Sequence, residues 1–230
     1  MDCLSISLDA IDNNEKKGLF KDSPVSVLES KISEVDEIEA LDLVPESKVS
    51  TGETLINFEK GNKLERIDLS RQLLQLGSLK RVETALRSSS FSGLRGLVLS
   101  HAGVTDLQAV SLCSAMKENK TLVTVDLSWN RIGNTGAKCF AGFLRNNSVL
   151  QTLYLFGNRI GDEGAKALAS SLTQNSRLLT LDISDNNEIS PKGCRFFADA
   201  LRKNRTLRTI RIENIRIDEA SVLCRNTYYR

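Results

Sequence analysis

The chain has 230 residues and a mass of 25.4 kDa, with 40% hydrophobic and 26% charged residues and a formal net charge of +2. This composition is ordinary for a soluble globular protein. The sequence contains no run of about 18 apolar residues, which excludes a membrane-spanning helix. Its first residues, Met1 to Leu4, lack the basic start and long apolar core of a signal peptide. We therefore expect a cytoplasmic protein.

The small net charge conceals an asymmetry along the chain. Residues 1–48 carry 12 acidic and 5 basic side chains, whereas residues 64–230 carry 24 basic and 15 acidic ones. An acidic N-terminal segment therefore precedes a basic body.

The residue types needed for catalysis or metal binding are sparse. The five cysteines lie far apart, and His101 is the only histidine. The sequence has no Cys-x-x-Cys pair, no Gly-x-Ser-x-Gly motif, no P-loop and no dinucleotide-binding fingerprint. We therefore predict no catalytic residue, no metal site and no cofactor, and we expect Cys113, Cys139 and Cys194 to be buried reduced thiols.

The first elements in chain order are an acidic tail and a helix. Residues 1–22 have few apolar side chains and are predicted to be flexible. After Ser23-Pro24, apolar residues recur at helical spacing until Pro45, and the polar face between them is acidic. The apolar positions are Leu28, Ile32, Val35, Ile38 and Leu41. Residues 23–63 are thus interpreted as an amphipathic helix and an N-terminal cap, with residues 55–58 sealing the first strand. A helix that folds only on a partner is the alternative.

A repeated unit occupies the rest of the chain. Short leucine-rich openings begin at positions 64, 94, 122, 150, 178 and 207, in steps of 28 to 30 residues. Each opening alternates apolar and polar residues, which predicts a short strand, and a turn and a helix follow. Residues 64–206 are predicted to be repeats, and residues 207–230 an incomplete last repeat that acts as a C-terminal cap. Alternatively, that edge meets a partner or a second copy.

Individual units carry local signals. The first unit is degenerate, because Gln72 replaces the expected asparagine and its helix is expected only over about residues 73–87. The fifth unit is one residue longer, so we expect a bulge at Asn187 or Glu188 between its strand and its helix. Ser190 and Pro191 have the residue types of a helix N-cap and first turn. Small residues such as those of 164–170 are expected to face the sheet.

An asparagine follows each helix, at Asn119, Asn147, Asn175 and Asn204. Asparagine tolerates the left-handed backbone that often ends a helix, and we expect that role here. Two of these residues also begin Asn-x-Thr sequences, which we interpret as structural rather than as glycosylation sites.

The openings have the pattern LxxLxLxxN, as in Leu150-Gln-Thr-Leu-Tyr-Leu-Phe-Gly-Asn158. Over about residues 64–225 the chain resembles the leucine-rich repeat family, and within it the ribonuclease-inhibitor-like subclass. The resemblance implies an α/β solenoid, a horseshoe arc with parallel strands on its concave face and helices on its convex face. It also implies that Asn130, Asn158 and Asn186 bond backbone groups in the turns, and that the protein binds another protein.

The strand pattern selects candidate partner-binding residues on the concave face. They are Asp126, Trp129, Tyr154, Phe156, Asp182 and Arg211. Tyr154 is expected to point outward, within an exposed aromatic cluster flanked by carboxylates. For Trp129 two interpretations stay open, a binding hot spot or a ring that folds over the turn against Phe156 for stability only.

We therefore predict a non-enzymatic interaction scaffold or regulatory adaptor whose partner is another protein. The alternatives within the resemblance are a GTPase activator, as in Ran GTPase-activating proteins, and an enzyme inhibitor. The basic body argues against an inhibitor of basic ribonucleases. The basic residues lie largely on predicted helices, where they could bind an acidic partner or the chain's own acidic N-terminal segment. Nucleic acid and membrane are not expected partners, and association with the cytoskeleton or a cilium is an option within the cytoplasm.

Overall fold

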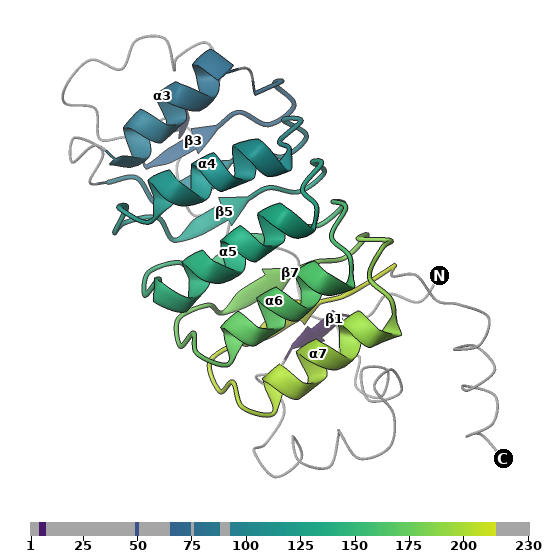
Figure 1. Ribbon diagram of the computed structural model, residues 1–230. Coiled ribbons are helices and arrows are strands. Elements are labelled where there is room, and N and C mark those ends of the chain that lie inside the picture. Colours follow the sequence, from purple (N-terminus) through teal and green to yellow (C-terminus); the bar gives the residue numbers. More distant parts are fainter. Residues whose placement is uncertain (1–4, 8–48, 51–64, 75, 88–92, 215–230) are drawn as a thin grey trace, which may run out of the picture.

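The computed structural model describes residues 5–7, 49–50, 65–74, 76–87 and 93–214 (Figure 1). Within them, each of the first five repeats forms one three-residue strand and one helix, and the sixth is described only around its strand. The repeat strands are β3 (Arg66–Asp68), β4 (Gly96–Val98), β5 (Thr124–Asp126), β6 (Thr152–Tyr154), β7 (Thr180–Asp182) and β8 (Thr209–Arg211). The helices are α3 (Leu76–Arg87), α4 (Asp106–Met116), α5 (Asn134–Asn146), α6 (Asp162–Leu172) and α7 (Pro191–Leu201).

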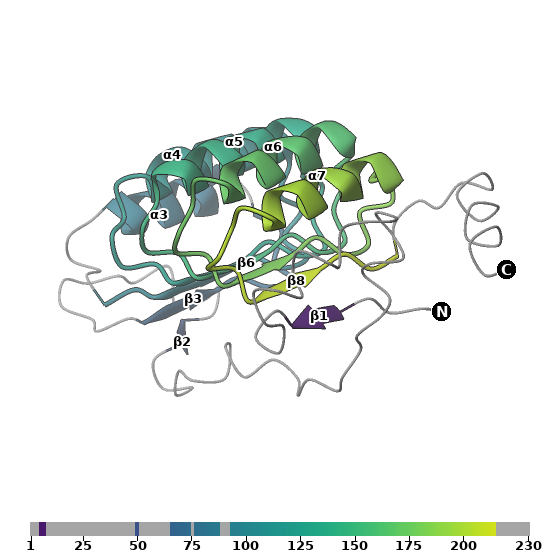
Figure 2. The same ribbon diagram turned by 90° about the horizontal axis from the view of Figure 1, so that it is seen from below.

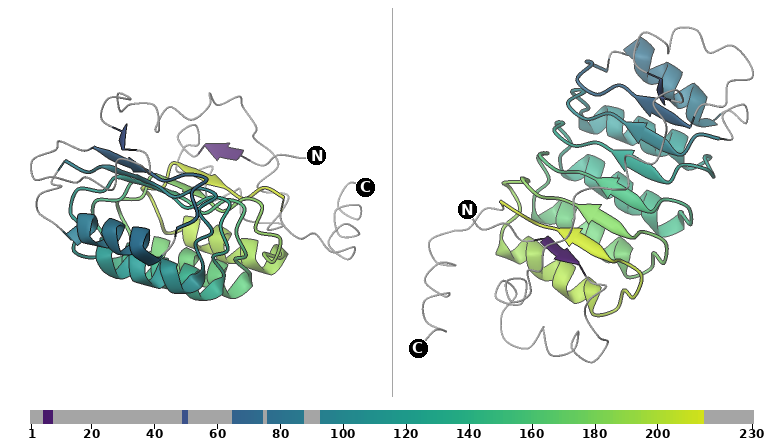
Figure 3. Two further views of the ribbon diagram at one scale, coloured as in Figure 1. Left: turned by 90° about the horizontal axis from the view of Figure 1, so that it is seen from above. Right: turned by 180° about the vertical axis from the view of Figure 1, so that it is seen from behind.

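The strands form one sheet, and the helices cover only one of its faces. The sheet order is β1-β8-β7-β6-β5-β4-β3-β2, and β3 to β8 pair in parallel with equivalent positions side by side. Figure 2 shows the helical layer on one side of the strand layer, and the right-hand view of Figure 3 shows the uncovered strands from behind. The predicted α/β leucine-rich repeat solenoid is confirmed.

The core lies between the two layers and repeats with the sequence. In β6 and just after it, Leu153 and Leu155 are fully buried in the core, while the residues between and beyond them point to the other face. The aliphatic residue before each helix is buried as well, at Val104, Ile132, Ile160 and Ile189. The fifth member of that predicted column, Ile217, lies outside the described residues.

Glycine lets α5, α6 and α7 pack closely against the preceding repeat, at Gly136, Gly164 and Gly193. A Cβ atom on Gly164 would lie 2.7 Å from Ile160 Cγ2, 2.8 Å from Asn134 Oδ1 and 2.9 Å from Ala137 Cβ. Real Cβ atoms do not approach other atoms so closely. Small residues were predicted to face the sheet, whereas Gly164 is required where α6 packs against α5.

The asparagines that follow the strands form the expected structural ladder. Asn158 Nδ2 donates hydrogen bonds to the carbonyls of Leu127 and Leu155, both at 2.9 Å. Its Oδ1 accepts a hydrogen bond from the backbone N–H of Ile132 at 3.0 Å. Asn130 and Asn186 make the same contacts in their own repeats. Each amide therefore satisfies three buried backbone groups that no strand or helix pairs.

The asparagines that follow the helices form a second ladder by a different route from the one predicted. Asn175 Oδ1 accepts from the N–H groups of Arg177 and Leu178, and its Nδ2 donates to the carbonyl of Leu144 in the previous repeat. The expectation of a left-handed backbone is wrong, because Asn147 leaves α5 with a φ of −95°. These residues act through their side chains. Asn119 and Asn204 are buried, which fits their structural interpretation.

A third ladder caps the helices and was not predicted. Asp106, the first residue of α4, accepts hydrogen bonds at its Oδ1 from Gly133 N and Gly136 N at 2.7 and 2.9 Å. These N–H groups belong to the start of α5, where no intrahelical acceptor exists. Asn134 caps α6 in the same way, and Asp162 caps α7 at Ser190. In this way α5, α6 and α7 are each capped by the helix of the preceding repeat.

The start of the fifth repeat's helix follows the prediction in detail. The side chain of Ser190 accepts from Lys192 N at the N-cap of α7, and Pro191 is the first helical residue. Asn186 makes the same hydrogen bond as the other asparagines that follow the strands, so it is in register with them. Beyond it, the backbone of Glu188 pairs with that of Gly161, as the backbone of Arg131 pairs with that of Thr105, but the first pair is 27 positions apart and the second 26. The extra residue therefore lies between Asn186 and Glu188, at Asn187, as one of the two predicted positions.

Both edges of the sheet are covered by strands from the first 50 residues. β2 (Val49–Ser50) pairs in parallel with β3, and β1 (Ser5–Ser7) pairs antiparallel with β8 (Figure 2). The first strand is thus covered by residues 49–50, whereas residues 55–58, predicted to seal it, lie outside the described residues, as do 23–41 and 215–230. At the other end, the open edge meets the chain's own N-terminal segment, and Ser5–Ser7 is a strand within the range predicted to be flexible.

Two chemical features of the described residues complete the fold. They include no helix that is long and apolar enough to cross a membrane. The cysteines on the helices are free thiols. Burial raises the pKa of Cys194 to about 12 and that of Cys113 further still. Cys139 is only partly buried, contrary to expectation, and a hydrogen bond from Cys113 lowers its pKa.

Candidate functional site: the concave face and its rim

Four of the predicted site residues lie side by side across the uncovered face of the sheet. The strand register pairs Asp126 with Tyr154, Tyr154 with Asp182, and Asp182 with Arg211. All four occupy the strand position whose side chain points away from the helices. The repeat register thus brings together on adjacent strands residues that are 28 or 29 positions apart in the sequence.

Tyr154 lies on this face but is not exposed there, so that part of the prediction is wrong. Its side chain is 8% exposed, although it is outside the core cluster between sheet and helices. Neighbouring strands are only about 4.8 Å apart, so flanking side chains cover much of a ring in the middle of the sheet. This burial raises the pKa of the Tyr154 hydroxyl, as do the carboxylates of Asp126 and Asp182, while Arg211 lowers it.

The two aspartates each have a structural bond in addition to any binding role. Asp126 Oδ1 accepts from Ser128 N at 2.8 Å, and Asp182 Oδ1 accepts from Ser184 N at 3.0 Å. Asp182 Oδ2 also lies 3.8 Å from an Arg211 guanidinium nitrogen. Burial is the main influence on Asp182 and raises its pKa, against the lowering effect of Ser184 and Arg211. Each carboxylate therefore fixes the local turn with one oxygen.

Trp129 lies at the rim of this face, where each strand turns toward its helix. Its ring is 47% exposed. The imidazole of His101 stacks on it at a centroid distance of 5.5 Å, and Phe156 meets it edge-on at 4.7 Å. A Cβ atom on Gly157 would lie 2.6 Å from the indole, so glycine is needed beneath the ring. The ring packs against Phe156, as the stability interpretation expects, and about half of the residue is exposed, so its role in binding stays a prediction.

The rim has a repeating backbone conformation that the sequence interpretation missed. One residue per repeat at this point has a positive φ, and most of these residues are not glycine. They are Arg71, His101, Trp129, Gly157, Asp185 and Asn214, with φ between 48° and 66°. Bulky side chains seldom adopt this conformation, which costs roughly 1–2 kcal/mol. All of these residues occupy the eighth position of their opening, and this shared position was the signal in the sequence. It includes His101, which stacks on Trp129 and was not among the predicted site residues.

The site has no arrangement suited to metal chemistry. Among the described residues, no three His, Cys, Asp or Glu side chains gather closely enough to hold a metal ion. What the concave face and rim present is a stacked aromatic group, flanked on the sheet by a buried hydroxyl, two carboxylates and a guanidinium. These groups suit contact with another molecule's surface.

Comparison with known proteins identifies the repeat. A family model described as Leucine Rich repeat matches residues 118–141, 146–169 and 174–198. These ranges start at equivalent points of three successive units and cover the strand and most of the helix in each. Residues 118–198 are therefore leucine-rich repeats, and the described strands and helices on either side continue the same unit. The assignment to the ribonuclease-inhibitor-like subclass stays a prediction.

Solved structures share the fold of this leucine-rich repeat protein at low sequence identity. The structure titled leiomodin-1 actin-binding site 2 is 20% identical, with a TM-score of 0.51, and the match covers 66% of this chain and 87% of that one. The C-terminal domain of tropomodulin from Caenorhabditis elegans is 13% identical, with a TM-score of 0.50, over 66% and 89% of the two chains. A search of curated proteins finds no match. At these identities the likeness shows the fold alone.

Proposed function

We propose that this leucine-rich repeat protein is a non-enzymatic interaction scaffold that binds a partner protein on the rim and concave face around Trp129. The observation that carries the proposal is the half-exposed indole, held between His101 and Phe156 above Gly157. An aromatic ring that is fixed before binding loses little conformational entropy when a partner covers it. Buried tryptophans are the residues most often found to dominate protein–protein affinity.

The remaining predicted residues extend this anchor across the sheet. Phe156 joins the rim to the strand face, and Asp126, Asp182 and Arg211 supply charges around Tyr154. Because Tyr154 is 8% exposed, we assign it a supporting role beneath the contact rather than the central one. The surface combines an aromatic centre with a polar surround, which is the usual anatomy of a protein-binding site.

Actin is the first partner to test. One neighbour is titled as an actin-binding site of leiomodin-1, and its match covers 87% of that chain. The shared fold is what supports actin as the partner to test. A cytoskeletal partner also agrees with the cytoplasmic location that we propose.

The decisive variant is Trp129→Gly. It removes the indole and leaves the turn intact, because the next repeat already has glycine at this point, at Gly157. Loss of the ring contacts costs about 0.5–1.5 kcal/mol each, and relief of the left-handed tryptophan returns a similar amount. The thermal midpoint should therefore change little. Lys166→Ala, on the helical face, serves as the matched control.

We expect wild type and Lys166→Ala to co-sediment with actin filaments and Trp129→Gly to lose most of that binding. If actin does not bind, the same three proteins are used as baits in native lysate, with bound proteins identified by mass spectrometry. Proteins lost only with Trp129→Gly would then name the partner. Equal partner sets for all three baits would overturn the assignment of the site.

A further inference from the structure

Exposed apolar side chains gather at the N-terminal end of the repeat array. Leu73, Leu76, Leu107 and Val110 are 71%, 80%, 83% and 40% exposed. Apart from Trp129, they are the large hydrophobic side chains that the described residues expose. We call these four residues the N-terminal apolar patch. A local concentration of this kind on one repeat pair indicates a contact surface rather than scattered exposure.

The patch is continuous across the first two described repeats. Leu73 lies against the turn before α4, since a Cβ atom on Gly103 would be 2.7 Å from Leu73 Cδ1. Gln108, the neighbour of Leu107 in α4, donates to the carbonyl of Leu74 at 2.8 Å. Leu76 and Leu107 are the first and second residues of adjacent helices, whose axes in such packing lie about 8–10 Å apart. The four side chains therefore form one surface.

The chain's own N-terminal segment arrives at this end of the array. β2 (Val49–Ser50) pairs with β3, the strand of the repeat that contains Leu73 and Leu76. Residues 24–43 therefore end only five residues before a strand that is already fixed here. Five extended residues span about 17 Å, enough to reach a neighbouring face of the same repeat. Their sequence has an apolar residue every three or four positions, as a helix docked by one face requires.

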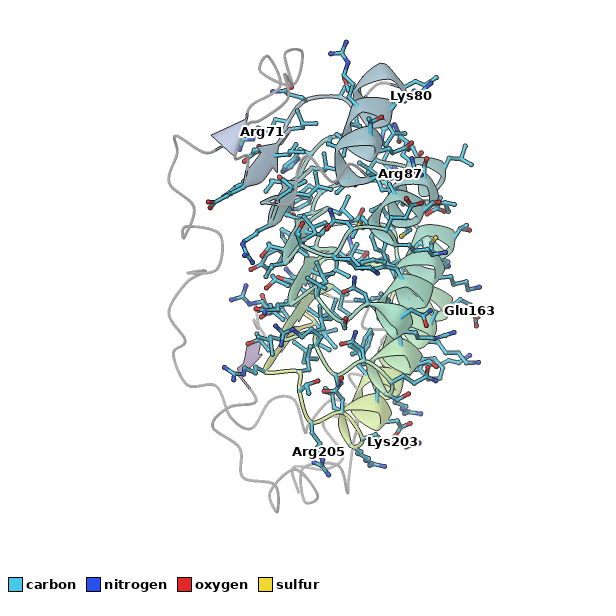
Figure 4. All side chains as sticks on the ribbon, turned by 90° about the vertical axis from the view of Figure 1, so that its left-hand side faces the viewer. Arg71, Lys80, Arg87, Glu163, Lys203 and Arg205 are labelled. Carbon is cyan, nitrogen blue, oxygen red and sulfur yellow. The ribbon has the colours of Figure 1, made fainter. Side chains whose placement is uncertain are left out.

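Charge also favours this segment over a second copy of the chain. Around the patch, Arg71, Lys80 and Arg81 are exposed, and Figure 4 shows Arg71 and Lys80 at the same end of the array. The polar positions of residues 24–43 are mainly acidic, with Glu29, Glu34, Asp36, Glu37 and Glu39. A second copy would instead place Arg71, Lys80 and Arg81 against the same three residues of the other chain, which is unfavourable.

We propose that residues 24–43 form an amphipathic helix that docks, within the same chain, on the N-terminal apolar patch. The apolar stripe of the helix covers Leu73, Leu76, Leu107 and Val110. Its acidic face lies beside the basic side chains of Arg71, Lys80 and Arg81. This contact covers the repeat array at its first unit, whose opening departs from the repeat pattern at Gln72. It is separate from the surface around Trp129 and does not depend on it.

Photocross-linking tests the proposal directly. A benzophenone amino acid replaces Leu107, which is exposed and can be changed without disturbing the core, and a second protein has it at Lys203 near the opposite end (Figure 4). Mixing isotope-labelled and unlabelled full-length chains distinguishes cross-links within a chain from those between chains. We expect Leu107 cross-links to residues 24–43 of the same chain and none to that segment from Lys203. Cross-links between chains, or none to that segment, would overturn the proposal.

Hydrogen exchange provides a second, independent measurement. In wild type, backbone amides of residues 24–43 should exchange slowly. The variant Leu107→Ser, Val110→Ser should lose this protection while the amides of β5 to β7 keep theirs. Trp129→Gly, which tests the partner site, should leave protection of residues 24–43 unchanged. A segment that exchanges freely in wild type, or whose protection survives the patch variant, would contradict docking.

Discussion

The asparagine ladder shows how much a single side chain carries in this fold. Asn158 satisfies three backbone groups from two repeats, at distances of 2.9 to 3.0 Å, inside a core where water cannot replace it. Leaving a buried donor or acceptor without a partner costs about 1–3 kcal/mol. The polar groups of one small residue thus link the turns of neighbouring units.

We therefore predict that Asn158→Ala lowers the free energy of unfolding by about 2–4 kcal/mol, because several buried groups lose their partner together. Urea denaturation monitored by circular dichroism measures the change. Asn187→Ala is the matched control, since Asn187 is the exposed inserted residue and should be silent. Equal midpoints for the two variants would show that the ladder contributes no stability.

Asp182 gives a pH-dependent prediction. Burial raises its pKa in the folded protein, so between the unfolded-state value of about 3.9 and the higher folded value the native state binds more protons than the unfolded one. Its effect on stability is therefore favourable at low pH and becomes unfavourable as pH rises through that window. Asn has the same shape and can still accept from Ser184 N–H.

We expect Asp182→Asn to be as stable as wild type, or more stable, at pH 7, and to lose that advantage at pH 3. Urea midpoints of both proteins at the two pH values test this. A variant that is clearly less stable than wild type at pH 7 would mean that the contact with Arg211, at 3.8 Å, outweighs the burial of the charge.

At the scale of elements, close helix packing overrides intrinsic helix propensity. Gly164 in α6 and Gly142 in α5 are both helical glycines, yet only the first is enclosed. Three atoms lie within 2.9 Å of a Cβ on Gly164, whereas none lies within 4 Å of a Cβ on Gly142. The same substitution should thus have opposite effects in adjacent helices.

Gly142→Ala should raise stability by up to about 1 kcal/mol, the difference in helix propensity between the two residues. Gly164→Ala should lower it by about 1–3 kcal/mol, because an extra methyl group must displace a packed neighbour. Thermal denaturation of the two variants side by side checks the sign. Stabilisation by both would show that the helices can move apart freely.

The elements also show where sequence reasoning reached its limit. The strands, the start of α7 and a bulge at Asn187 or Glu188 were predictable because they depend on local pattern and spacing. The caps supplied by Asp106, Asn134 and Asp162 were not, because their acceptors serve N–H groups about 27 to 30 positions further along the chain. The burial of Tyr154 likewise depends on side chains of neighbouring strands and not on its own register.

At the scale of the whole molecule, the candidate site was only partly predictable. The repeat period correctly placed Asp126, Tyr154, Asp182 and Arg211 on consecutive strands. It could not show that His101 stacks on Trp129, since that depends on a turn conformation shared by every repeat. Nor could it place a strand from residues 5–7 at the far edge of the sheet.

That edge strand leads to a prediction for the intact protein. In β8, the N–H of Thr209 and the carbonyl of Arg211 form hydrogen bonds on the β7 side. The backbone groups of Ile210, between them, therefore face β1, where Ile6 is the paired residue. Ile6→Pro removes the donor that faces β8, whereas Ser7→Pro changes a backbone group that faces away. An unpaired sheet edge is a template for association with other chains.

We therefore expect Ile6→Pro to associate at high concentration and Ser7→Pro to behave as wild type. Sedimentation velocity over a concentration series provides the measurement. If both variants stay at the mass of the wild-type species, β1 is not what protects this edge. Association of both would point to a general effect of proline in the segment.

The helix caps all run in one direction along the chain, because each acceptor belongs to the repeat before the helix that it caps. Asp106 lies at the start of α4 and accepts a hydrogen bond from the backbone at the start of α5. Asn134 and Asp162 do the same for α6 and α7. During synthesis the earlier repeat leaves the ribosome first, so the acceptor is in place before the helix that needs it has been made. The series ends at α7, whose first residue is Pro191 and has no side-chain acceptor. A further repeat added after α7 would therefore have to supply the N-cap of its own helix, whereas α5, α6 and α7 receive theirs from the repeat before.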